Sequence, residues 1–247
     1  MKRQKGALKL QGSHGDFTFA QTKNGFIWKE KAPVDKARKI NERIVNNFTE
    51  FGTAGRAVKL LRDAFRDQVK YAKDRLLTSR LQTLMLKAIK GDIVSKPGER
   101  NAANGDLAML EGFQCNAKAI FRDTLGQEYS NYIDRAAGKT GFSVPAFVPK
   151  QSLTVPEGST HFRIDAACSE IDFTNGKHAT NSASTGWLPI DDTAITPIAL
   201  VNLFTAGSQL PVFLAAGIRF VEIVNGYEQQ ISGGEHSALC FVQIDNS

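Results

Sequence analysis

The stretch that decides the fold is residues 55–89, which read GRAVKLLRDAFRDQVKYAKDRLLTSRLQTLMLKAI. At about 100° per residue, apolar side chains recur on one narrow face of a helix. The residues on this face are Val58, Leu61, Phe65, Val69, Ala72 and Leu76. An apolar face of this kind is the side that a helix turns toward a core. We therefore expect Leu61, Phe65, Val69 and Leu76 to be core residues.

A cationic stripe follows the same helix beside the apolar face. It is made of Lys59, Arg62, Arg66, Lys70 and Lys73. Asp63 and Asp67 stand three residues before Arg66 and Lys70, and each such pair contributes only a few tenths of a kcal/mol. Two interpretations stay open. The stripe is either a solvated surface or a contact surface for an acidic partner such as nucleic acid.

The apolar register fails after Leu76, where a second helix is predicted. Ser79, with Gln82 three residues later, has the pattern of a capping box at a helix start. Apolar residues then recur at helical spacing, namely Leu81, Leu84, Met85 and Ala88. Gly91 is expected to end this helix.

Charge is distributed unevenly along the 247 residues, whose net charge is +6. Residues 1–100 contain 23 Lys and Arg against 10 Asp and Glu, whereas residues 101–247 contain 8 against 15. A cationic front can attract nucleic acid or a membrane surface. It can equally attract the acidic back of a neighbouring copy in a head-to-tail contact.

Residues 6–31 are expected to form a small antiparallel sheet. Phe17 and Phe19 alternate with Thr18 and Ala20, and Asn24-Gly25 predicts a type I′ hairpin turn. Such a sheet is marginal alone, so its aromatic face must pack on the following helices or on another subunit. The predicted assembly contact is Phe17, Phe19, Phe26 and Trp28.

The rest of the chain predicts an α+β fold. A helix is expected from about Asp35, with Ile40, Ile44, Phe48 and Phe51 at helical spacing. Charge sign and periodicity both change within residues 91–112. Short apolar segments separated by turns, including Asn225-Gly226, then predict a C-terminal antiparallel β-sandwich. The expected domains are a basic arm with a β-hairpin at 1–32, a basic helical region at 33–112 and the β-sandwich at 113–247.

Residues 198–218 carry no charge, over a length that could cross a bilayer. They include Asn202, Gln209 and Pro211, and Gly207-Ser208 predicts a turn. Two buried elements joined by a turn fit better, so no transmembrane span is expected. The N-terminus lacks the apolar region of a secretory signal. The expected location is the cytoplasm, or an assembled particle or filament.

No motif predicts catalysis, a cofactor or a metal. Cys115, Cys168 and Cys240 are far apart and form no C-x-x-C pair, so each is expected to pack as a small buried hydrophobe. No two His lie at a metal-ligand spacing. The adjacent acids Asp191 and Asp192 are a weak cation candidate, and residues 98–101 and 138–141 are weak anion nests.

Several stretches carry a resemblance to a known group of proteins. They are RQKG (3–6), LQGSHGDFTF (10–19), TKNGF (22–26), EFGTAG (50–55), LLRDAFR (60–66), GERN (98–101), VPEGSTHFRI (155–164) and GIRFVEIVNGYE (217–228). Together they resemble a family of uncharacterised basic proteins of Bacteroidota. Ala20 stands where that family has an aromatic residue in the first hairpin. The resemblance implies the domain plan given above and no activity.

Four functions are compatible with these observations. The first is a non-enzymatic, self-assembling structural protein, such as a coat, shell or filament subunit, which would be a homo-oligomer. The second is non-specific binding of nucleic acid by the basic helix, although aromatic residues are not interleaved with the basic ones for base stacking. The third is a β-sandwich that binds carbohydrate or peptide. The fourth is an enzyme of unrecognised type.

Overall fold

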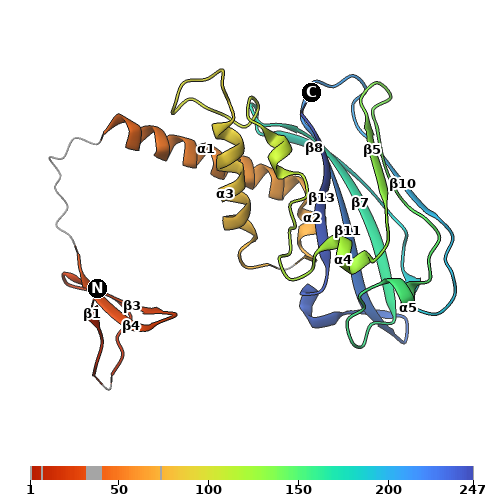
Figure 1. Ribbon diagram of the computed structural model, residues 1–247, viewed down its shortest axis with the longest axis horizontal. Helices are drawn as coiled ribbons and strands as arrows, with labels where there is room; N and C mark the ends of the chain where they lie inside the picture. Colours follow the sequence, from red (N-terminus) through yellow and green to blue (C-terminus); the bar gives the residue numbers. More distant parts are fainter. Residues whose placement is uncertain (1, 7, 32–40, 73, 247) are drawn as a thin grey trace. The chain divides into compact units, whose positions relative to one another are not determined.

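The computed structural model describes residues 2–6, 8–31, 41–72 and 74–246. The chain divides into two compact units, Met1–Asn41 and Glu42–Ser247. Helices and antiparallel sheets occur together, so the predicted α+β class is confirmed (Figure 1). The helix start expected near Asp35, and Ile40 with it, lie outside the described residues.

The first unit is a four-stranded antiparallel sheet in the order β1-β4-β3-β2. Its strands are β1 (Lys2–Arg3), β2 (Gly12–His14), β3 (Phe17–Thr22) and β4 (Gly25–Glu30). The predicted hairpin is present, but the prediction of a type I′ turn at Asn24-Gly25 is wrong. That turn needs positive φ at both central residues, and in the described chain Asn225 is the non-glycine residue with positive φ. Gly25 instead pairs with Thr22 as the first residue of β4.

The second unit begins with a helical layer. Its helices are α1 (Glu42–Ala64), α2 (Arg66–Val69) and α3 (Leu77–Lys90), followed along the chain by η1 (Leu107–Leu110), α4 (Phe121–Leu125), α5 (Pro149–Ser152) and η2 (Ile231–Gly234). α1 ends because Phe65 leaves helical geometry, with φ −104° and ψ 25°. The apolar register was expected to hold as far as Leu76, but α1 ends at Ala64, twelve positions earlier.

The capping box predicted at Ser79 is wrong, because α3 already begins at Leu77. Asp74 accepts a hydrogen bond from the backbone N–H of Leu76 at 2.7 Å and so orders the turn before the helix. Ser79 lies inside the first turn, and the Gln82 side chain donates to the Phe51 carbonyl of α1. The predicted end at Gly91 is confirmed.

Two antiparallel sheets complete the second unit. The large sheet runs β12 (Tyr227–Gln230), β11 (Val212–Val224), β7 (His161–Asp172) and β8 (Lys177–Ser184), with β13 (Ala238–Asp245) on β11 and β9 (Leu188–Pro189) on β7. The small sheet runs β10 (Ile198–Leu203), β6 (Lys139–Val144) and β5 (Ser130–Asp134). The β11–β12 turn has φ 51° at Asn225 and 82° at Gly226, which confirms the predicted type I′ hairpin there.

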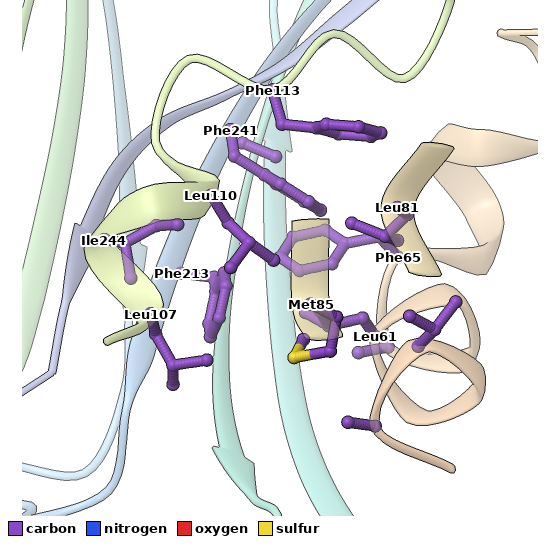
Figure 2. Packing of buried hydrophobic residues seen from close by; sticks show 14 of the residues in the cluster. Leu61, Phe65, Leu81, Met85, Leu107, Leu110, Phe113, Phe213, Phe241 and Ile244 are labelled. Atoms are coloured by element: carbon purple, nitrogen blue, oxygen red, sulfur yellow. The ribbon is translucent and has the colours of Figure 1, made fainter. Parts of the chain in front are cut away.

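The central strands of the large sheet, β7, β11 and β13, are buried on both faces. On one face α1, α3 and η1 cover an apolar cluster that includes Ala167 and Ile171 of β7 (Figure 2). On the other face α4 and the small sheet share a second cluster that includes Ile164 and Ala166. In Figure 1 the helices α1 and α3 accordingly lie on one side of the sheet, with β5 and β10 on the other.

The predicted helix core is confirmed except at Leu76, and Ala72 is only 2% exposed. Val58, Leu61 and Phe65 are at most 1% exposed, whereas Leu76 is 63% exposed. Val69 is partly buried against the cluster. Leu76 is exposed because the chain turns between α2 and α3, and that turn resets the helical register.

The uncharged residues 198–218 form β10 and the first part of β11, joined by a turn that contains Gly207. Within the described part of the chain, no helix has the length and hydropathy needed to cross a membrane.

Candidate functional site

The first candidate surface is the aromatic face of the N-terminal sheet. Phe19 lies opposite Trp28 and Gln21 opposite Phe26 in the β3–β4 ladder. Residues opposite one another point to the same side of a sheet. Phe17, Phe19, Phe26 and Trp28 therefore share one side, which we call the aromatic face. The Phe17 and Trp28 rings meet edge to face with centroids 5.3 Å apart, and Lys2 Nζ lies 5.3 Å from the Trp28 ring centroid.

This unit has no core of its own among its described residues. Every described side chain of residues 2–41 is exposed or half-buried, and Phe17 is 39% exposed. A sheet with one apolar face becomes stable when a second layer covers that face. The aromatic face is therefore only partly covered by the described residues of its own unit.

A second apolar surface runs along the first half of α1. Ile44, Phe48 and Phe51 fall on one side of the helix and are 42%, 68% and 55% exposed on the second unit. Val45 beside them is also exposed. The sequence pattern is that of a core helix, but the helices and sheets of this unit cover only the other half of α1. We call these four residues the α1 stripe.

The third candidate surface is a pair of adjoining cationic grooves. The first groove has a volume of about 500 Å³, and its lining includes Lys59, Arg62, Arg66 and Lys70. The structure thus brings four of the predicted cations together, whereas the fifth, Lys73, lies outside the described residues. The second groove, of about 550 Å³, shares Arg62 and Lys70 with the first and adds Arg75, and its lining also includes the acids Asp74 and Glu235.

Two of these cations are already paired. Arg66 bonds Asp63 at 2.7 Å and Lys70 bonds Asp67 at 3.0 Å, as the sequence spacing predicted. The hydrogen bond from Arg66 lowers the pKa of Asp63, and the bond to Asp67 raises the pKa of Lys70. Lys59, Arg62 and Arg75 form no ion pair with any other described residue. These three supply the attraction for an anion.

Arg75 was missed by sequence reasoning. It follows the end of α2, and only the turn between α2 and α3 brings it to the groove. On a continuous helix its position would lie away from Arg62. No signal in the sequence marks that change of direction.

The candidate anion nest at residues 98–101 is occupied by the protein itself. The Gly98 amide donates to the buried Glu50 carboxylate at 3.0 Å, and the Asn101 amide donates to Asp92 at 3.3 Å. Burial acts to raise the pKa of Asp92, but hydrogen bonds from the backbone of Ser95 and neighbouring residues outweigh it, so the pKa is lowered. These two amides therefore serve the fold, although the loop also lines an open groove of about 660 Å³ together with Arg56 and Phe173.

The other weak motifs have structural roles. Gly138 lies in the turn before β6, and residues 139–141 are the first residues of that strand. Asp192 pairs with Lys150 at 2.8 Å, and Asp191 accepts the Thr193 amide. Among the described residues, no cluster of three or more His, Cys, Asp or Glu side chains is suited to a metal ion.

The three cysteines are buried, as expected. Burial raises the pKa of the Cys240 thiol to about 11 and that of Cys168 to about 12. Burial also raises the pKa of Cys115. A nucleophilic cysteine must reach its thiolate form near neutral pH, and these environments oppose that ionisation.

Comparison with known proteins does not assign the chain to a family. No family model matches it, and no curated protein matches it. A solved structure described as "pH-induced modulation of Streptococcus parasanguinis adhesion by Fap1 fimbriae" is similar over 48% of this chain and 82% of its own, at 14% identity and a TM-score of 0.22. So low a TM-score carries no argument about fold or function.

Proposed function

We propose that this protein is a non-enzymatic structural subunit that assembles with copies of itself through its N-terminal sheet. The observation that carries the proposal is the aromatic face, which gathers four aromatic side chains on a sheet that buries none of its described residues. Apolar surface of this kind marks an interaction site in soluble proteins. A coat, shell or filament subunit is the class of protein in which such an arm contacts a neighbour.

The distribution of charge supports this proposal. The described residues of the N-terminal sheet carry 7 Lys and Arg against 2 Asp and Glu. Residues 101–247 carry the opposite balance. Opposite charge on separate parts of one chain favours a head-to-tail contact between copies, which closes into a ring or continues as a filament. The exposed α1 stripe offers a further apolar surface for such an assembly.

In this proposal residues 113–247 act as a β-sandwich that forms the rigid body of the subunit. Support comes from the second apolar cluster, to which both the large and the small sheet contribute. Two sheets that share one core form a stable layer pair. The body would then keep its fold when the N-terminal sheet is removed.

Deleting residues 2–31 should make the protein smaller in solution without unfolding it. The reason is that the second unit has two apolar clusters of its own. Molar mass is measured by size-exclusion chromatography with light scattering, and folding by circular dichroism. A full-length protein that is monomeric at high concentration, or a truncated protein of unchanged association state, would contradict the proposal.

Two neighbouring substitutions provide a matched test within full-length protein. Phe26 lies on the aromatic face, whereas Ile27 beside it points to the opposite side of β4. Phe26→Ala should shift the protein toward monomer, and Ile27→Ala should shift it less. If the two variants associate equally, the contact does not use the aromatic face.

Non-specific binding of nucleic acid is a second candidate function, favoured by the joined cationic grooves. Replacing Lys59, Arg62 and Arg75 with Gln should flatten the plot of log affinity against log salt, because each lost phosphate contact removes about 0.7–0.9 from its slope. A control variant replaces Arg122, Lys139 and Lys150, three exposed cations on the β-rich part of the chain that lie outside both grooves. Fluorescence anisotropy with a labelled oligonucleotide measures both slopes. Equal slopes would exclude the grooves as the contact.

A further inference from the structure

A charged cluster lies on the large sheet, on the side that faces the helices. Arg163 of β7 is directly opposite Arg219 of β11, and Asp165 is opposite Gly217. One step further along the strands, Ala167 and Ala215 on the same side belong to the apolar core. This side of the sheet therefore changes from apolar to charged where the helical layer ends.

Asp165 holds both arginines. Arg163 Nε bonds one carboxylate oxygen at 2.8 Å, and Arg219 bonds both oxygens, at 2.7 Å from Nε and 3.0 Å from Nη2. The side chains of Asp165 and Arg219 are 10% and 15% exposed, whereas Arg163 is 31% exposed. Arg163 is thus fixed at Nε, while its remaining N–H groups form no other hydrogen bond among the described residues.

Two aromatic rings border the same cluster. The Arg219 guanidinium lies 4.0 Å from the Tyr71 ring centroid and 5.8 Å from that of Trp187. The Trp187 indole N–H donates to Glu228 at 2.5 Å. Glu228 is therefore turned toward the indole, so it does not satisfy the free N–H groups of Arg163. The two arginines carry two positive charges, and Asp165 and Glu228 carry two negative charges, so the net charge of the cluster is zero.

A cavity of about 200 Å³ opens between these groups. Its lining includes Arg163, Arg219, Trp187, Tyr71 and Ser237. Ser237 is only 4% exposed, and its hydroxyl has no hydrogen-bond partner among the described residues. Here the hydroxyl borders a cavity that also presents unused guanidinium donors.

We propose that this cavity binds a small organic carboxylate with a flat apolar body. A cavity of about 150 Å³ is large enough for benzene, so this one can hold a molecule the size of benzoate. The Arg163 fork and the Ser237 hydroxyl supply donors, and a carboxylate supplies the acceptors that match an arginine fork. The Trp187 ring supplies a flat apolar wall. Asp165 and Glu228 would repel a dianion more strongly than a monoanion, so a ligand with one negative charge fits better than one with two. This inference is independent of the proposed assembly.

Trp187 makes the site directly observable. The chain has two tryptophans, Trp28 and Trp187, so the Trp28→Phe variant leaves Trp187 as the sole indole fluorophore. Titration with sodium benzoate should give a saturable change in its emission. Benzamide, which has the same shape and no charge, should bind at least tenfold more weakly. Each titration is repeated at matched ionic strength, so that added salt does not produce the signal.

Variants of the lining residues complete the test. In the Trp28→Phe background, Arg163→Gln should weaken benzoate at least tenfold while leaving benzamide nearly unchanged. Ser237→Ala is a smaller change that keeps the ion cluster and should also weaken benzoate, so the test remains decisive if Arg163→Gln does not fold. Arg122→Gln, at an exposed arginine paired with Glu128, is the control. Equal affinity for benzoate and benzamide, no saturable change, or full benzoate affinity in Ser237→Ala would overturn the proposal.

Discussion

Phe65→Ala is expected to lower the free energy of unfolding by about 3–5 kcal/mol, the usual loss when a buried aromatic ring is deleted from a core. Phe65 is fully buried, and its ring centroid lies 5.3 Å from that of Phe241. Figure 2 shows it between the helices and the large sheet, among Leu110, Leu81 and Met85. Because neighbours on every side come from different elements, they cannot all move to fill the space. Urea denaturation followed by circular dichroism measures the loss.

A leucine pair provides a matched control for this prediction. Leu61 and Leu76 were both expected in the core, yet Leu61 is 1% exposed and Leu76 is 63% exposed. Leu61→Ala should therefore cost about 2–5 kcal/mol, and Leu76→Ala should stay within about 0.5 kcal/mol of the unmodified protein. Similar losses in both variants would show that the turn before α3 is packed differently.

In the helical core, sequence periodicity predicts buried residues correctly while the helix is continuous. Spacing predicted Val58, Leu61 and Phe65 correctly because α1 is continuous up to Ala64. The prediction then failed at Leu76, since Phe65 leaves the helix and the following turn changes which side faces the sheet. The end of α1 before Phe65 is therefore determined by tertiary contacts and not by the local sequence. Burying Phe65 against Phe241, far along the chain, has no local signature.

The β region was predictable where local turn chemistry decides the structure. Asn225-Gly226 forms the expected turn because both residues adopt positive φ. By contrast, the sequence predicted short apolar strands, whereas Val212–Val224 forms the single long strand β11. Its centre is apolar on both sides because each face has a covering layer. A strand buried on both faces loses the alternation that sequence reasoning depends on.

The candidate surfaces were predictable only in part. Alternation in β3 and β4 gave the aromatic face, and helical spacing gave the cations of the first groove. The α1 stripe could not be found, because exposed and buried apolar faces have the same spacing in a sequence. Arg163 and Arg219 are 56 positions apart along the chain, and only the β7–β11 register makes them neighbours.

Asp165→Ala is expected to lower the free energy of unfolding by about 3–5 kcal/mol, because removing one partner of a buried ion pair leaves the other charge uncompensated. Asp165 is the sole ion-pair partner of both Arg163 and Arg219 among the described residues. The side chain of Arg219 is only 15% exposed. Without Asp165 its charge would be shielded mainly by the rings of Tyr71 and Trp187, which replace a carboxylate incompletely.

The double variant Asp165→Ala with Arg219→Met distinguishes this cause from a simple loss of packing. Removing the stranded charge together with its partner should recover much of the loss, since apolar groups of similar volume often replace a buried pair at little cost. Asp63→Ala breaks an exposed pair and should cause no measurable loss. Urea denaturation at matched pH and salt measures all three variants. If the double variant is no more stable than Asp165→Ala, the stranded charge of Arg219 is not what destabilises the single variant.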